Sequence, residues 1–174
     1  DAQVVTNPKG KSMLVSHLDL APEKIITVED GETLSLGDRT IKFVYTPWVH
    51  WPETMSTYLI EDRILFTCDF FGAHLATSDL YVTDEWLVRD AAKRYYAEIM
   101  MPFRSVIQKD LEKIKAYDFE MIAPSHGPVY DRPDFIVQAY DEWVNGEAHN
   151  LVVLPYVSMH GSTHKMVRFL VERL

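Results

Sequence analysis

The 174-residue sequence has a single cysteine, Cys68, which excludes a disulfide within the chain. One thiol suits a reducing compartment, so we expect a cytoplasmic location. No apolar run approaches the ~20 residues of a membrane-spanning helix, and we therefore expect no membrane segment. Basic side chains are in the minority, with 17 Lys and Arg against 26 Asp and Glu. The resulting net charge of −9 argues against nucleic acid as a partner.

Repeats and low-complexity segments are also missing, and what remains has the composition of an ordinary globular protein. Apolar residues make up 47% and charged residues 25% of the chain, enough for one domain with a real core. Cys68 stands directly before Asp69 at the end of a strand-like run. Strand alternation predicts opposite directions for the two side chains, and we expect Cys68 to be a small buried thiol.

The first half of the chain is divided into short runs typical of β-strands. Asn7-Pro8-Lys9-Gly10 is typical of a turn, after which a first helix follows. Asp30-Gly31 and Glu61-Asp62 indicate hairpin turns. Together the runs predict a meander that buries one face. The expected strands are residues 4–6, 24–28, 33–36, 40–45, 57–60 and 63–67.

After Asp69 the apolar period changes from that of strands to that of helices. We expect a loop over residues 75–82 and then three helices, with one further strand over residues 120–123 before the third helix. The expected helices cover residues 84 to about 101, ended by Pro102; residues 105–117; and a segment with Asp131 as N-cap and Pro133 in its first turn, ending near Val144. Trp86, Ala91, Tyr95 and Ile99 are expected on one apolar face of the first of these.

A second unit is expected after residue 147, so that residues 1–147 and 148–174 form separate domains. Residues 151–155 form a continuous apolar run, typical of a strand buried on both faces. Residues at helical spacing follow, up to Leu174. The turn between them suits a phosphate at a helix N-terminus, although it matches neither the Rossmann nor the Walker pattern. The residues of this turn are Ser158, Met159, His160, Gly161, Ser162 and Thr163.

Three polar residues, His50, Asp69 and His126, follow apolar strand-like runs in turn-rich segments. They are 19 and then 57 residues apart, which is too far for a local motif and fits a site gathered by the fold. Two imidazoles and a carboxylate are ligands that suit zinc, iron or manganese. The sequence therefore predicts a metal site built from these three side chains.

The same segments resemble the metallo-β-lactamase-like domain of flavodiiron proteins. Residues 46–59 (TPWVHWPETMSTYL) look like the second histidine segment of that family. Residues 69–72 (DFFG) look like its bridging-aspartate segment, and residues 123–128 (APSHGP) look like its last-histidine segment. The family's first ligand cluster, of the form His-x-Glu-x-Asp-His, has no counterpart here. We therefore interpret the chain as the middle of a longer polypeptide that carries about half of a dinuclear site.

The resemblance implies an α/β fold: the C-terminal part of a metallo-β-lactamase-like αββα sandwich, followed by the first βα unit of a flavodoxin-like domain. It implies a parent oxidoreductase that passes electrons from FMN to two non-haem irons and reduces dioxygen to water or nitric oxide to nitrous oxide. Asp69 would bridge the irons, with one histidine on each. Tyr95 and His74 are candidates for residues near the bound diatomic. The turn at residues 158–163 would hold the FMN phosphate.

The resemblance also implies partners, and other functions remain open. Rubredoxin or a reduced deazaflavin would donate electrons, and a head-to-tail homodimer would bring the FMN of one subunit to the irons of the other. One alternative is a hydrolase of the wider metallo-β-lactamase superfamily, in which a dinuclear metal activates water. A second is a non-catalytic truncated chain or half of a split protein. A third is an electron carrier that uses the flavodoxin-like unit alone.

Overall fold

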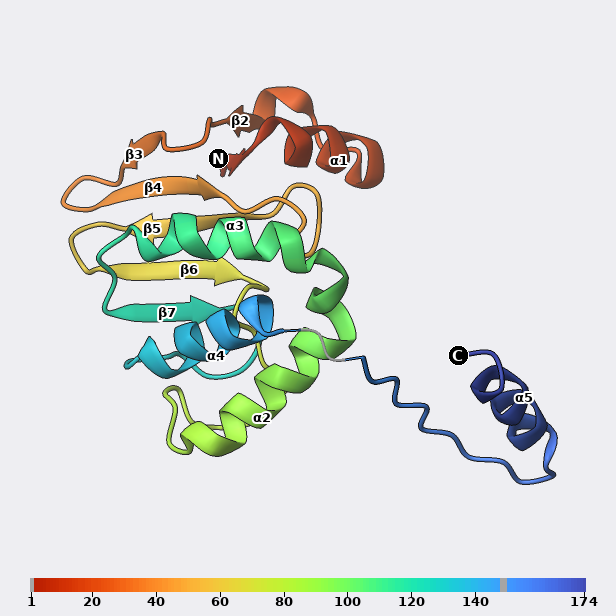
Figure 1. Ribbon diagram of the computed structural model, residues 1–174. Helices are drawn as coiled ribbons and strands as arrows, with labels where there is room; N and C mark the ends of the chain where they lie inside the picture. Colours follow the sequence, from red (N-terminus) through yellow and green to blue (C-terminus); the bar gives the residue numbers. More distant parts are fainter. Residues whose placement is uncertain (1, 148–149) are drawn as a thin grey trace.

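The computed structural model describes residues 2–147 and 150–174, and a five-stranded sheet is its main element (Figure 1). The strand order is β3-β4-β5-β6-β7, antiparallel from β3 to β6, whereas β7 runs parallel to β6. A smaller parallel pair, β1 and β2, lies beside it. The strands are β1 Val4–Thr6, β2 Ile25–Thr27, β3 Thr33–Ser35, β4 Thr40–Tyr45, β5 Met55–Leu59, β6 Ile64–Cys68 and β7 Met121–Pro124.

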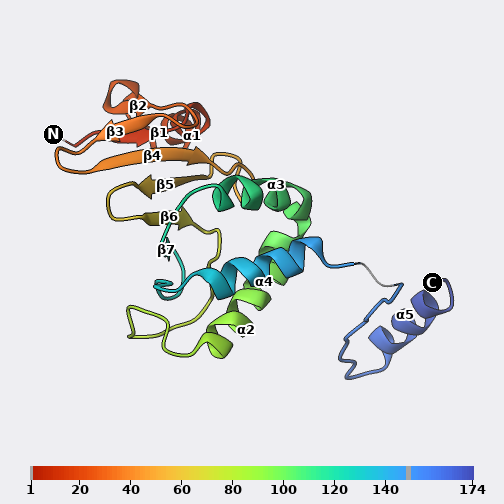
Figure 2. The same cartoon turned by 60° about the vertical axis from the view of Figure 1, so that its left-hand side comes forward.

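Helices cover one face of this sheet. Figures 1 and 2 both show α3 and α4 lying across the strands, with α2 beside α4. α1 follows β1 and lies at the end of the domain opposite to α2 and α4 (Figure 1). The helices are α1 Pro8–Leu18, α2 Glu85–Tyr95, α3 Arg104–Lys115, α4 Asp134–Asn145 and α5 Ser162–Val171, and tighter or wider helical turns over residues 96–103 join α2 to α3.

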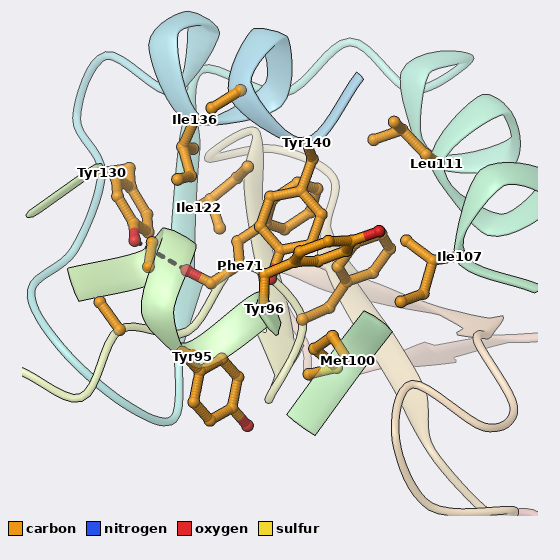
Figure 3. Close-up of a cluster of buried hydrophobic side chains, with 14 of the residues drawn as sticks. Phe71, Tyr95, Tyr96, Met100, Ile107, Leu111, Ile122, Tyr130, Ile136 and Tyr140 are labelled. Carbon is orange, nitrogen blue, oxygen red and sulfur yellow. Dashed lines mark hydrogen bonds between the residues drawn. The ribbon is translucent and has the colours of Figure 1, made fainter. Parts of the chain in front are cut away.

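The hydrophobic core lies between the sheet and helices α2 to α4. Strand alternation turns Leu65 of β6 toward these helices, and this residue is fully buried. Phe66, on the other face, keeps 45% of its surface exposed. Figure 3 shows aromatic and aliphatic side chains from β7 and all three helices meeting in one cluster. Burial of each such large side chain contributes about 1.5–3 kcal/mol to the stability of the fold. The layer of helices α2 to α4 therefore holds in place the sheet that carries the candidate site.

Most expected elements are confirmed, including the hairpin at Glu61-Asp62 and the loop over residues 75–82. Five local expectations were wrong. Asp30-Gly31 does not form a hairpin, because β2 and β3, the strands on its two sides, belong to different sheets. Asn7 to Gly10 is not a free turn but the N-cap and first turn of α1. Pro133, not Asp131, occupies the N-cap of α4. Trp86 is 76% exposed because it lies on the outer face of α2. Cys68 is exposed because strand alternation puts it on the same outward face of β6 as Phe66.

The C-terminal segment differs from the expectation of a buried strand. Residues 151–155 form no strand, and Leu151, Val152 and Val153 are exposed. A strand needs a neighbour for its backbone hydrogen bonds, and no described strand pairs with this run. The helix expected next is present as α5, apart from the sheet (Figure 1). Residues 148–149, at the expected domain boundary, lie outside the described residues. Within the described ranges, no helix is both long and apolar enough to span a membrane.

Candidate metal centre

The sheet brings His50, Asp69 and His126 to one edge. β4, β6 and β7 run in the same direction, so their carboxyl ends meet at the same side of the sheet (Figure 1). His50 lies in the loop that follows β4, Asp69 directly follows β6, and His126 lies two residues beyond β7. Strand direction therefore accounts for the meeting of residues that are far apart in the sequence.

One carboxylate serves both imidazoles in this arrangement. Asp69 Oδ2 lies 3.2 Å from His50 Nε2, and Asp69 Oδ1 lies 3.3 Å from His126 Nε2. Two donor atoms that each lie about 2.1 Å from one ion, at an angle somewhat above a right angle, are roughly 3.2 Å apart. The nitrogen and oxygen donors and their separations thus fit two ions that share the Asp69 carboxylate. The Asp69 side chain is only 17% exposed, and those of His50 and His126 are 26% and 46% exposed.

The chain leaves β6 through a sharp turn that aims the Asp69 side chain. Cys68 and Phe71 both have positive φ, at 53° and 65°. The Thr67 hydroxyl donates to the Phe70 carbonyl at 2.6 Å, and the Gly72 N–H donates to the Asp69 carbonyl at 3.0 Å. A Cβ on Gly72 would lie 3.0 Å from that same carbonyl oxygen, so only glycine fits without a shift. These contacts hold the carboxylate at the sheet edge.

His126 is held by backbone contacts between the two parallel strand ends. The Ser125 N–H donates to the Cys68 carbonyl at 2.7 Å, and the Ala73 N–H donates to the His126 carbonyl at 3.0 Å. Gly127 has a φ of 86°, in the left-handed region that favours glycine. The segment after β6 and the segment after β7 are therefore tied together on both sides of the site.

His50 belongs to the loop over residues 46–54. The Trp51 carbonyl accepts hydrogen bonds from the Trp48 N–H at 2.7 Å and from the Thr54 hydroxyl at 2.9 Å. Val49 is fully buried beneath the loop. The Trp48 ring stacks on Phe103, with ring centroids 6.1 Å apart.

Tyr95 and His74 lie close to this centre. The His74 ring lies 4.5 Å from the Tyr95 ring and 5.3 Å from the His126 ring, measured between centroids. Tyr95 is buried at the border of the core, and Figure 3 shows its hydroxyl pointing away from the other labelled side chains. Burial raises the pKa of the Tyr95 phenol well above its ordinary value, and the nearby Asp69 carboxylate adds to this effect. The hydroxyl therefore keeps its proton at neutral pH.

The centre is incomplete within the part of the chain that the structure describes. No three or more His, Cys, Asp or Glu side chains there are grouped around one point where a single ion would bind. Each oxygen of Asp69 has one imidazole beside it, which gives two protein donors per ion. Structural and catalytic metal sites usually have three or four protein ligands. A complete site needs donors from outside these residues.

The expected phosphate turn precedes α5 and lies away from the metal centre (Figure 1). Gly161, the N-cap of α5, has a φ of 79°. The Ser158 hydroxyl accepts from the His164 N–H at 3.3 Å, and His164 Nδ1 lies 2.5 Å from the Tyr156 hydroxyl. The structure thus supports the turn as a helix N-terminus and does not bring it next to Asp69.

Two turn residues were not singled out from the sequence: Asn7, the N-cap of α1, and Gly127, which follows His126. Asn7 precedes Pro8, and an Asn-Pro pair at the start of a helix is an N-cap signal that the sequence did contain. Gly127 directly follows His126, and a glycine beside a candidate ligand in a turn is a signal of positive φ.

Comparisons with known proteins agree with this architecture. The profile of the ODP family beta lactamase matches residues 1–127. A coenzyme F420H(2) oxidase from Methanothermobacter marburgensis is 36% identical over 168 residues, which are 93% of this chain and 42% of that protein. A nitric oxide reductase from Moorella thermoacetica is also 36% identical, over 100% of this chain and 45% of its own length. The chain spans less than half the length of these relatives.

The fold also matches solved structures. Rubredoxin oxygen:oxidoreductase from Desulfovibrio gigas superposes with a TM-score of 0.84 and 33% identity, over 98% of this chain and 44% of that one. The flavodiiron protein from Giardia intestinalis gives a TM-score of 0.79 and 30% identity, over 97% and 42%. The sheet, its helical layer and the match to the beta-lactamase profile define a metallo-β-lactamase-like α/β domain. Within that class, the chain belongs to the flavodiiron (A-type flavoprotein) family.

Proposed function

We propose that this chain is part of a flavodiiron oxidoreductase that reduces dioxygen to water or nitric oxide to nitrous oxide. The observation that carries the proposal is the placement of one carboxylate between two imidazoles, each facing a different oxygen. A carboxylate with both oxygens engaged in this way is suited to bridge two ions. Membership of a family that contains an oxidase and a nitric oxide reductase supports the choice of reaction.

In this proposal His50, Asp69 and His126 would hold two irons, with the Asp69 carboxylate shared between them and one imidazole for each. Two irons bound there would supply the redox change that reduction of a diatomic substrate requires. Zinc has no redox chemistry, and the histidine and carboxylate donors suit iron. The missing ligands would come from a cluster on the preceding part of the parent polypeptide.

Tyr95 and His74 are the proposed outer residues of the same centre. The protonated Tyr95 hydroxyl can donate a hydrogen bond toward the metal pocket, because the pKa of the phenol is far above neutral pH. The His74 imidazole can move a proton and is exposed to solvent. His74 is also near enough to His126 to restrict the orientation of that ring.

We further propose that residues 148–174 open a flavodoxin-like domain, whereas residues 1–147 are a partial metallo-β-lactamase-like domain. Backbone N–H groups of the turn from Ser158 to Thr163 would hold the FMN phosphate at the N-terminus of α5. Because the turn lies away from Asp69 in this chain, electrons would reach the irons from the flavin of a partner subunit in a head-to-tail homodimer. Rubredoxin or a reduced deazaflavin is the proposed donor, and the cytoplasm is the proposed location.

The test is metal and flavin analysis of the full-length parent protein and three variants, His50→Ala, Asp69→Asn and His126→Ala. We expect the parent to contain iron and FMN and to consume dioxygen or nitric oxide with reduced flavin. Each variant should bind iron roughly 10-fold or more weakly than the parent and should keep FMN. His17→Ala is the matched control, because His17 is exposed on α1, and it should keep both. Full iron content in all three variants would contradict the assignment, and zinc without flavin would favour the hydrolase.

A further inference from the structure

The loop that carries His50 is tied to the start of α1 by one side chain. Asn7 Nδ2 donates a hydrogen bond to the Glu53 carbonyl at 2.6 Å, across 46 residues of sequence. Within residues 2–147 and 150–174, no other hydrogen bond reaches residues 46–54 from outside the loop and its two flanking strands. The contact between His50 and Asp69 is the other polar link from this loop to the rest of the site.

The amide of Asn7 has only one favourable orientation. Its Oδ1 accepts the Gly10 N–H at 2.7 Å as the N-cap of α1, so Nδ2 must point the other way, toward Glu53. A flipped amide would place a donor against the Gly10 N–H and an acceptor against the Glu53 carbonyl. Asn7 is 4% exposed, so water cannot replace either bond easily.

The backbone at Asn7 is fixed as well. Thr6, the residue before it, pairs with Thr27 across the parallel β1–β2 ladder, and its carbonyl accepts the Val28 N–H at 3.0 Å. The Asn7 carbonyl accepts the Lys11 N–H at 3.0 Å in the first turn of α1. β1 and α1 therefore fix the position of Asn7, and of its Nδ2 donor, independently of the loop.

The Glu53 carbonyl that accepts from Asn7 belongs to the turn next to His50. Glu53 lies inside the turn in which Thr54 donates twice to the Trp51 carbonyl, at 3.2 Å from its N–H and 2.9 Å from its hydroxyl. Trp51 is the neighbour of His50 and is 53% exposed, so its own packing does not fix the loop. A shift of the Glu53 carbonyl would move this turn and, with it, the His50 imidazole. To act as a ligand, that imidazole must stay within about 0.5 Å of its position beside Asp69.

We propose that Asn7 is a positioning residue that holds the His50 imidazole beside Asp69. The expected effect on metal binding rests on the proposed metal function, because a displaced ligand weakens metal binding. The anchoring of the loop by the Asn7 hydrogen bond does not depend on any metal. The two parts can therefore be tested separately.

The experiment compares Asn7→Asp and Asn7→Ser in this 174-residue chain. Both substitutions keep an oxygen that can cap α1, and both remove the Nδ2 amide group that donates to Glu53, since the shorter serine carries only the hydroxyl that serves as the cap. Only the first adds a charge, so an effect shared by both variants belongs to the lost hydrogen bond. Asn145→Ser is the matched control, because Asn145 also donates from its side-chain amide but is exposed at the end of α4.

The first measurement is amide hydrogen exchange at Trp48 and Thr54, whose N–H groups donate within the loop. We expect about 10-fold faster exchange at both in each Asn7 variant, the size of effect that one lost hydrogen bond gives. The Gly10 and Lys11 amides should change less, which would show that α1 is intact. Unchanged exchange at Trp48 and Thr54 would overturn the proposal.

The second measurement is calorimetric titration with Co²⁺, with Asp69→Asn as the variant that defines binding at this site. We expect the Asn7 variants to bind Co²⁺ roughly 10-fold more weakly than the wild-type chain, and Asn145→Ser to bind normally. Equal affinity in spite of a loosened loop would overturn the positioning role. If the wild-type chain, with its two donors per ion, binds no Co²⁺ at Asp69, the exchange result alone decides whether Asn7 anchors the loop, and the metal function is decided by the iron content of the full-length protein.

Discussion

Asp110 is a buried acid on the inner face of α3, where its neighbours are core residues. It is 7% exposed, and its Oδ2 has no hydrogen-bond partner among the described residues. Burial raises the pKa of Asp110 to about 6; Asp30 adds to the rise and Lys113 opposes it. Lys113 is itself bonded to Asp30 and to the Tyr45 carbonyl, so it is not free to neutralise Asp110.

We predict that Asp110 makes the protein less stable as pH rises from about 4 to above 6. The folded state holds this proton to a higher pH than the unfolded chain, whose aspartate pKa is near 3.8, so the free energy of unfolding falls through this window. Asp110→Asn keeps the shape without the charge and should be more stable than the wild type at pH 8, by on the order of 2–3 kcal/mol. Urea unfolding from pH 4 to pH 8 measures the difference.

The control for this prediction is Asp131→Asn, an exposed aspartate in the connection before α4. Its unfolding free energy should follow that of the wild type within about 0.5 kcal/mol. Parallel pH profiles for Asp110→Asn and the wild type would show that Asp110 is not the titrating group.

Gly127→Ala should destabilise the chain and displace His126. The φ of 86° is strained for alanine, and the new Cβ would lie 2.9 Å from the Ala73 carbonyl oxygen. Gly37 has a φ of 105°, but a Cβ at this position would have nothing within 4 Å, so Gly37→Ala carries the strain without the clash. We expect about 1 kcal/mol for Gly37→Ala and roughly 2–4 kcal/mol for Gly127→Ala in thermal unfolding. Equal losses in the two variants would contradict a close approach at Gly127.

At the residue scale, the sequence predicted which side chains meet but not what holds them. The shared position of His50, Asp69 and His126 at one sheet edge follows from strand direction, and the structure has it; their role as ligands stays a prediction. Asn7 could not be found in the same way, because its partner is a backbone carbonyl 46 residues away, which leaves no mark on the side-chain pattern. Cys68 was assigned wrongly because the expectation rested on the general burial of free cysteines, whereas this residue lies on the exposed face of β6.

A buried side-chain hydrogen bond adds to the backbone bonds between the segment after β6 and the segment before α4. The Tyr130 hydroxyl donates to the Phe71 carbonyl at 2.7 Å, and Figure 3 shows this bond inside the cluster. Tyr130→Phe would leave that carbonyl buried without its donor. We expect a loss of about 1–3 kcal/mol in the free energy of unfolding, measured with urea.

Tyr81→Phe is the matched control for this contact, because Tyr81 is 42% exposed. It should change the free energy of unfolding by less than about 0.5 kcal/mol. If Tyr130→Phe were equally mild, the contact would not contribute to holding the turn that follows Asp69.

At the element scale, local patterns predicted the strands of the sheet better than the C-terminal strand. β4 was expected over residues 40–45 and has those bounds, because alternation and flanking turns are both properties of the segment itself. The run at residues 151–155 has the right composition for a strand, but strand formation depends on a neighbouring backbone, and none of the described strands lies beside this run. Composition alone could not show that the neighbour is missing.

At the scale of the whole molecule, the helical layer closes only one face of the sheet. Phe66 is exposed on the face opposite α3 and α4, and within the described residues both strands of the β1–β2 pair have an open edge. The α/β class and the family could be predicted from the sequence, because they depend on segments that the chain contains. The separation of α5 from the sheet could not, since it depends on contacts between units and not on the pattern within either one.

The separation of α5 from the sheet predicts that removal of residues 148–174 will have little effect on stability. No residue of α5 is buried, and Figures 1 and 2 show it standing apart from the sheet and its helices. A chain that ends at Glu147 should therefore melt within about 2 °C of the 174-residue chain, because 1 kcal/mol corresponds to roughly 2–4 °C at this size. Ile136→Ala, at a fully buried position of α4, should lower the unfolding free energy by about 2–5 kcal/mol in either chain. A fall in melting temperature on truncation as large as that of Ile136→Ala would show that residues 148–174 pack against the domain in solution.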